Sequence, residues 1–147
     1  MVETATVLTR LSDARDAVLR DCPQLPQEEL RIDWDPSVLA GATDEIEPDD
    51  PQCFVVRIGG GAKTLPVEKG MGHTTAAIAS AVQDYIVDET HRPWPELVDR
   101  EGRSAVLDVE ADDDRAFWVG PGFQSAAVGE LLAAAQRQNL KVHGNGQ

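Results

Sequence analysis

Apolar residues recur at helical spacing in three stretches of the chain. In the first stretch the intervals are four, three and four residues: Val7, Leu11, Ala14 and Val18. This spacing places the apolar side chains on one face and predicts a helix over residues 3–20, which the following prolines end.

The other two stretches predict helices in the middle and near the end of the chain. Isoleucine and valine residues four apart share one face of a helix predicted over residues 75–89, and small alanines between them would let another element approach closely. Thr74 or Thr75 would cap its first turn. A third apolar stripe predicts a last helix, with Ser125 as its cap.

Two other patterns are typical of strands. Residues 30–35 alternate between apolar and charged positions, which predicts a half-buried strand. Residues 53–58 are rich in β-branched and aromatic side chains, and the three glycines that follow predict a β-hairpin. A second hairpin is predicted from strands over 105–109 and 116–119, joined by an acidic turn.

These elements follow the order α-β-ββ-α-ββ-α. Consecutive strands with tight turns pair antiparallel, so the pattern predicts an α+β fold with one antiparallel sheet of four to five strands and helices packed mainly on one face. The length is that of one domain. We therefore expect residues 1–147 to form a single α+β domain, with an exposed acidic loop at 41–52 and a frayed tail at 140–147.

The charge balance restricts the partners of the chain. Asp and Glu number 26 against 13 Lys and Arg, which gives a formal net charge of −13. Such a surface repels nucleic-acid phosphates and anionic membranes, so neither is expected as a partner, whereas it attracts a basic protein. Much of the acidity falls in two runs, 44–50 and 110–114, where solvation of exposed loops explains it without any partner.

The sequence predicts a cytoplasmic protein with reduced cysteines. The start of the chain is charged and amphipathic rather than an apolar signal segment. No apolar run approaches the roughly 18 residues that span a bilayer. The excess of Arg over Lys, together with abundant Ala, is typical of a GC-rich bacterial genome.

Several motifs suggest chemistry but lack residues that the chemistry requires. The run RIGGGAKT at 57–64 has Ala62 before its lysine and no helix after it, so we interpret it as a hairpin turn rather than a phosphate-binding loop. The run GMGHTT at 70–75 would offer helix-start amides to an anion, but every helix start does so. The histidines and cysteines lack metal-ligand spacing, so no metal, other cofactor or catalytic residue is assigned.

The segment HRPWPE, residues 91–96, is the strongest binding candidate. Prolines on both sides of Trp94 stiffen the backbone and hold its ring at little entropic cost, and His91 and Arg92 stand beside it. Trp118 is a further candidate because it and its neighbour Phe117 face opposite sides of a strand, and only one of them can be core. The structural alternative is that Trp94 closes one end of the core.

These observations favour a non-catalytic module that binds another protein. An immunity protein or antitoxin that neutralises a basic toxin would fit, as would a subunit of a larger assembly. The alternative is a small enzyme or ligand-binding protein with a pocket near His91–Trp94, to which Glu89 would contribute. A third hypothesis is a mimic of nucleic-acid charge, and a homodimer through the alanine-rich helix or a sheet edge is also compatible with the sequence.

Overall fold

Helices and strands alternate irregularly along the computed structural model, which describes residues 4–39 and 51–143. In chain order they are α1 (Thr4–Asp21), β1 (Leu30–Trp34), β2 (Phe54–Ile58), β3 (Gly61–Thr64), α2 (Met71–Thr90), β4 (Glu96–Val98), β5 (Ser104–Val106), β6 (Asp108–Ala111), β7 (Ala116–Gly120), β8 (Phe123–Ala127), α3 (Leu131–Arg137) and β9 (Lys141–Val142). Short 3-10 helices, including η1 (Gln27–Glu29) and η4 (Val67–Lys69), lie in the connections.

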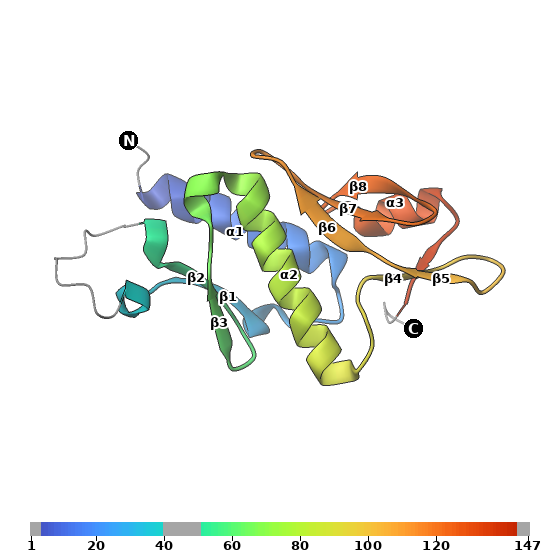
Figure 1. Cartoon of the computed structure of the whole chain (residues 1–147), viewed down its shortest axis with the longest axis horizontal. Coiled ribbons are helices and arrows are strands. Elements are labelled where there is room, and N and C mark those ends of the chain that lie inside the picture. The colour runs from blue at the N-terminus through green and yellow to red at the C-terminus, as the bar shows by residue number, and fades with distance from the viewer. Residues whose placement is uncertain (1–3, 40–50, 144–147) are drawn as a thin grey trace.

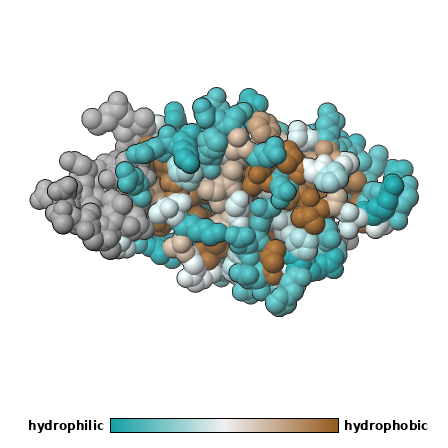
Figure 2. All heavy atoms as spheres, in the orientation of Figure 1, coloured by the Kyte–Doolittle hydropathy of each residue, from teal (hydrophilic) through white to brown (hydrophobic). Residues whose placement is uncertain are grey.

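The described strands form three antiparallel sheets of three strands each. Their strand orders are β1-β2-β3, β5-β4-β9 and β6-β7-β8. Figure 1 shows the first sheet toward one end of the elongated molecule and the other two sheets, with α3, toward the opposite end. Helix α2 crosses between them, and α1 runs from the end that holds the first sheet toward the middle. In the same orientation, hydrophilic side chains cover much of the described surface, and apolar side chains show between them (Figure 2).

The α+β class and the antiparallel pairing are confirmed, but the arrangement in one sheet of four to five strands differs from the structure. The extended run 104–111 is shared by two sheets, because Leu107 turns inward, is fully buried, and donates its amide to the carbonyl of Pro95 at 2.9 Å. Residues before Leu107 pair with β4, and residues after it pair with β7. One buried residue therefore divides what the sequence pattern presents as a single strand.

A continuous apolar core joins the two long helices to the sheets. Three residues of the stripe predicted for the first helix, Leu11, Ala14 and Val18, are buried in it, and Val7 packs against its border. Among the largest fully buried side chains are Phe54 of β2 and Trp118 of β7. Helical spacing in the sequence therefore identified the buried face of α1 correctly.

The start of α2 lies earlier than the sequence predicts. The helix begins at Met71, and the hydroxyls of Thr74 and Thr75 donate to carbonyls one turn back instead of capping it. The reason is the close approach of the β6–β7 turn: the amide of Gly72 donates to the carbonyl oxygen of Asp113 at 3.0 Å, and a Cβ on Gly72 would lie 2.0 Å from the carbonyl oxygen of Asp112. The glycine marks a backbone contact here, not a helix break.

The end of the chain differs most from expectation. Ser125 lies in β8 and does not cap a helix, because the turn at Pro121–Gly122 continues the hairpin and α3 begins only at Leu131. Part of the tail predicted to fray, 140–147, is strand β9, whose Lys141 and Val142 pair with β4. Residues 144–147 and the acidic run 44–50 lie outside the described residues.

Candidate functional site

The segment HRPWPE leads from the end of α2 into β4. His91 closes the helix in a left-handed conformation, with φ 58°, and its amide donates to the carbonyl of Val87 at 2.8 Å. His91 and Arg92 are exposed, and the Arg92 guanidinium pairs with Glu96 at 2.9 Å. The prolines keep the following residues out of the helix, as the sequence predicts.

Trp94 and Trp118 are both core residues. Trp94 is 2% exposed and Trp118 is 0% exposed, and their rings meet edge to face with centroids 5.2 Å apart. The structure thus brings these two predicted residues together inside the molecule and leaves His91 and Arg92 on its surface. The four residues do not form one exposed binding surface.

A buried carboxylate holds the Trp118 ring in place. Asp21, at the end of α1, is 1% exposed and accepts three hydrogen bonds: one from the Trp118 indole at 2.8 Å, one from the Gly129 amide at 2.5 Å and one from the Leu131 amide at 3.0 Å. Burial raises the pKa of the Asp21 carboxyl, and these hydrogen bonds oppose that rise. We interpret Asp21 as a structural residue that joins α1 to β7 and the start of α3. Nothing in the sequence around it distinguishes it from the other acids.

A cavity of about 410 Å³ opens beside HRPWPE. Its walls come from three parts of the chain: the α1–β1 connection, the last turns of α2 with the segment that follows, and the residue after β9. The lining residues are Gln24, Leu25, Pro26, Tyr85, Ile86, Glu89, Thr90, Arg92, Pro93, Trp94 and His143. The volume lies within the range of roughly 300–1,000 Å³ that is common for ligand pockets.

A second cavity of about 300 Å³ lies between the β2–β3 turn and α2. The two cavities share Tyr85 and Glu89 as lining residues. We call the pair of cavities the Tyr85 groove. The α2 residues that line it all come from the C-terminal half of that helix.

Tyr85 is held against the β2–β3 turn. A Cβ at Gly59 would lie 2.8 Å from the Cε1 atom of Tyr85, so the ring packs where only a glycine leaves room. Partial burial raises the pKa of the Tyr85 phenol, and the carboxylates of Glu89 and Glu29 raise it further. The sequence placed Tyr85 on the apolar face of its helix, but it held no sign that Glu29, from a distant segment, lies within electrostatic reach of the ring.

The carboxylates around the Tyr85 groove differ in their pairing. Asp84 pairs with Lys63 at 2.6 Å. Glu29, Asp88 and Glu89 are exposed and form no ion pair within residues 4–39 and 51–143. The groove therefore carries uncompensated negative charge beside an aromatic ring.

The indole N–H of Trp94 is the buried polar side-chain atom that lacks a hydrogen-bond partner in the described part of the chain. Trp94 lines the larger cavity of the Tyr85 groove. A buried donor without an acceptor costs about 1–3 kcal/mol, and because the indole nitrogen is itself buried, a molecule in the cavity does not reach it in this conformation.

The remaining sequence motifs have structural roles. The glycine run after β2 forms a hairpin with β3, as predicted. In GMGHTT the β6–β7 turn approaches the start of α2, and the carbonyl of Asp113 accepts the Gly72 amide, so this amide is already paired. Within the described residues no group of three or more His, Cys, Asp or Glu side chains could hold a metal ion. Both cysteines are buried without a disulfide, and burial raises the pKa of the Cys22 thiol to about 12, which suppresses the thiolate a nucleophile needs.

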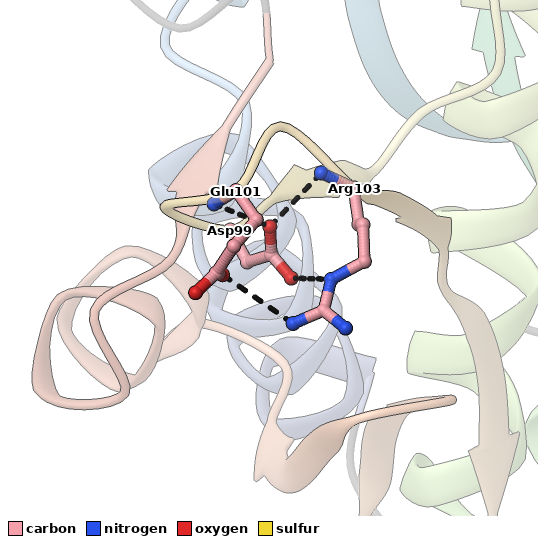
Figure 3. Close-up of polar contacts among 3 residues, drawn as sticks. All are labelled: Asp99, Glu101 and Arg103. Atoms are coloured by element: carbon pink, nitrogen blue, oxygen red, sulfur yellow. Dashed lines mark hydrogen bonds and ion pairs between the residues drawn. The ribbon is translucent and has the colours of Figure 1, made fainter.

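A larger hollow, of about 570 Å³, borders the β4–β5 turn. Figure 3 shows the polar contacts that close this turn: Asp99 accepts the amides of Glu101 and Arg103, both at 2.9 Å, and pairs with the Arg103 guanidinium at 2.8 Å, while Arg103 also reaches Glu101 at 3.3 Å. The charged side chains of this turn pair with one another, so we interpret the cluster as stabilising the turn rather than as a binding site.

Comparison with known proteins finds no family model, no curated protein and no solved structure that matches this chain. Among the described helices none is both long and apolar enough to cross a membrane.

Proposed function

We propose that this chain is a non-catalytic module that binds a basic partner protein. The observation that supports this most directly is the Tyr85 groove, where an aromatic ring and apolar walls stand beside Asp88 and Glu89, two carboxylates that have no cationic partner within the described residues. Buried apolar contact surrounded by charge is the usual composition of a specific protein interface. The net charge of −13 would speed the encounter with a basic protein over longer distances.

Two kinds of basic partner fit this proposal. One is a toxin that the chain neutralises as an immunity protein or antitoxin, and the other is a neighbouring subunit in an assembly. A mimic of nucleic-acid charge is a special case in which the partner also binds DNA or RNA. The cytoplasm, in a bacterial cell, is the proposed location for each of them.

The test is capture of a partner from an extract of the source organism with the tagged chain, followed by reconstitution from purified proteins. We expect a stoichiometric complex with a protein of high isoelectric point, and we expect its affinity to fall steeply between about 50 and 200 mM salt. Competition by DNA would identify the charge-mimic case. An unrelated protein of equal length and net charge is the control, and equal retention of the partner by that control would contradict the proposal.

A second candidate function is binding of a small molecule in the larger cavity of the Tyr85 groove. It is favoured by the size of this cavity, about 410 Å³, and by the apolar side chains of Leu25, Ile86 and Trp94 that line it. Arg92→Ala and Trp94→Phe separate the two functions. If a bound metabolite co-purifies with the native chain and both variants lose it, the ligand-binding function is supported. If both variants change only the melting temperature, it is refuted.

Self-association is a further proposal about partners. Val87 of α2 and Val106 of β5 are exposed apolar side chains, at 42% and 44%. Sedimentation equilibrium of the purified chain measures its oligomeric state, and a monomer at tens of micromolar would refute a homodimer.

A further inference from the structure

We propose that the Tyr85 groove binds an arginine side chain of the partner, with the guanidinium against the Tyr85 ring and beside the carboxylate of Glu89. This inference rests on the proposed function, because it names the chemical group of the basic partner that this chain recognises. Three independent features of the groove carry it: the ring, the unpaired charges and the apolar cavity next to them.

The ring is placed for contact with a cation. Tyr85 is half-buried, so part of its surface remains open, and its contact with Gly59 in the β2–β3 turn limits its movement. A cation within about 6 Å of an aromatic centroid is attracted by the ring quadrupole. A tyrosine that is already held in position loses little conformational entropy when a cation binds.

Unpaired carboxylates beside the Tyr85 ring attract a cation to it. Glu89 lines both cavities, and Glu29 lies on η1 within electrostatic reach of the Tyr85 phenol. Two neighbouring carboxylates already have partners: Asp84 pairs with Lys63, and Glu96 pairs with Arg92. Glu29 and Glu89 have no such partner among the described residues, so an incoming cation gains their attraction without breaking an ion pair.

The cavity explains why the cation belongs to a peptide rather than to a simple ion. Leu25, Ile86 and Trp94 give the larger cavity an apolar wall, which an aliphatic stem or a neighbouring apolar side chain would cover. A metal ion would use none of these groups.

Arginine suits the groove better than lysine. Its planar guanidinium stacks on an aromatic face and can donate to two carboxylates at once, whereas an ammonium is a compact, strongly hydrated point charge. The groove is therefore expected to rank an arginine peptide above a lysine peptide, and a lysine peptide above a neutral one.

The test uses three blocked tripeptides, acetyl-Leu-Xaa-Ala-amide, in which Xaa is arginine, lysine or citrulline. Citrulline has the shape of arginine without its charge. Tyr85 is the single tyrosine of the chain, so absorbance of the phenolate near 295 nm follows this residue alone. We expect the arginine peptide to bind at least about fivefold more tightly than the citrulline peptide and to lower the pKa of the Tyr85 phenol, because the bound cation stabilises the phenolate.

Variants of the full chain locate the binding. Glu29→Gln and Glu89→Gln are each expected to weaken the arginine peptide by about two- to fivefold, as loss of one exposed ion pair does, while leaving the citrulline peptide unchanged. Asp16→Asn, on the exposed side of α1, is the matched control and is expected to leave both peptides unchanged. Calorimetry with Tyr85→Leu, which keeps an apolar side chain without the ring, is expected to show the largest loss.

Three results would overturn the inference: equal binding of the arginine and citrulline peptides, no binding of any peptide at tens of millimolar, or equal effects of Glu89→Gln and Asp16→Asn. The outcome is separable from that of the proposed function. If a purified basic partner binds Tyr85→Leu as tightly as the wild type, the arginine site is wrong and the protein-binding function stands. If no partner protein is retained but the arginine peptide binds in the groove, the arginine site stands and the protein-binding function fails.

Discussion

Replacement of the buried Asp21 by asparagine tests how α1 is joined to β7 and to the start of α3. In the structure one carboxylate oxygen accepts the Trp118 indole and the Gly129 amide, and the other oxygen accepts the Leu131 amide. An asparagine whose carbonyl takes the first position keeps two hydrogen bonds in weaker, uncharged form. Its NH₂ group then faces the Leu131 amide, donor against donor, in a fully buried place.

The expected loss of stability follows from these contacts. A buried N–H left without an acceptor costs about 1–3 kcal/mol, and a hydrogen bond to a charged group is worth about 1 kcal/mol more than a neutral one. The opposite contribution is that asparagine carries no charge, so the variant does not bear the desolvation cost of a buried carboxylate. The same desolvation cost raises the pKa of Asp21. We expect a net decrease of about 2–3 kcal/mol in the free energy of unfolding of Asp21→Asn.

Urea denaturation followed by tryptophan fluorescence and by circular dichroism measures this change. With an m-value of about 2 kcal/mol per molar urea, the midpoint should fall by about 1 M. Asp16→Asn is the control, because the Asp16 side chain is 54% exposed and its ion pair with Arg15 is worth about 0.5 kcal/mol or less. If Asp21→Asn unfolds within about 0.5 kcal/mol of this control, the account of Asp21 as the link between α1, β7 and α3 is refuted.

Three further predictions concern other contacts. Gly72→Ala forces a Cβ to within 2.0 Å of a backbone carbonyl of the β6–β7 turn and should destabilise the chain by about 2–3 kcal/mol in urea denaturation. The control is Gly60→Ala, whose Cβ would have no atom within 4 Å and which should change stability by less than about 0.5 kcal/mol. Equal effects of the two substitutions would contradict the close approach of the turn to Gly72. Cys22, with its thiol pKa raised to about 12, should resist Ellman's reagent at pH 8 in the folded chain and react after denaturation, and rapid labelling of the native state would show that it is accessible. Amide hydrogen bonds from Arg115 and Asp114 lower the pKa of Asp112. The stability that this carboxylate contributes is therefore present above the unfolded pKa near 3.9 and is lost as pH falls through the folded value. The stability difference between the wild type and Asp112→Asn should be larger at pH 6 than at pH 3, and a difference that grows on acidification would contradict this.

The candidate site shows where sequence reasoning stopped. The stiff HRPWPE segment was recognised from its prolines, and the cavity does lie beside it, with Arg92 and Trp94 in its wall. Trp94 itself is buried in the core, and the ring that remains partly open is Tyr85, nine residues earlier. Which of two aromatic side chains faces solvent depends on what covers them, and the cover here comes from Trp118 and from the α1–β1 connection.

The sequence by itself determined those features that depend on neighbours a few residues apart. The spacing of Leu11, Ala14 and Val18 identified the buried face of α1, and the alternation in 30–35 identified the strand β1, because helices and strands repeat every 3.6 and 2 residues. Tertiary structure alone decided how the strands divide into three sheets, since that depends on one inward turn at Leu107 and on pairing with the end of the chain. It also decided which acid is structural: Asp21 meets Trp118 across 97 positions of sequence, and no local pattern encodes a contact of that range.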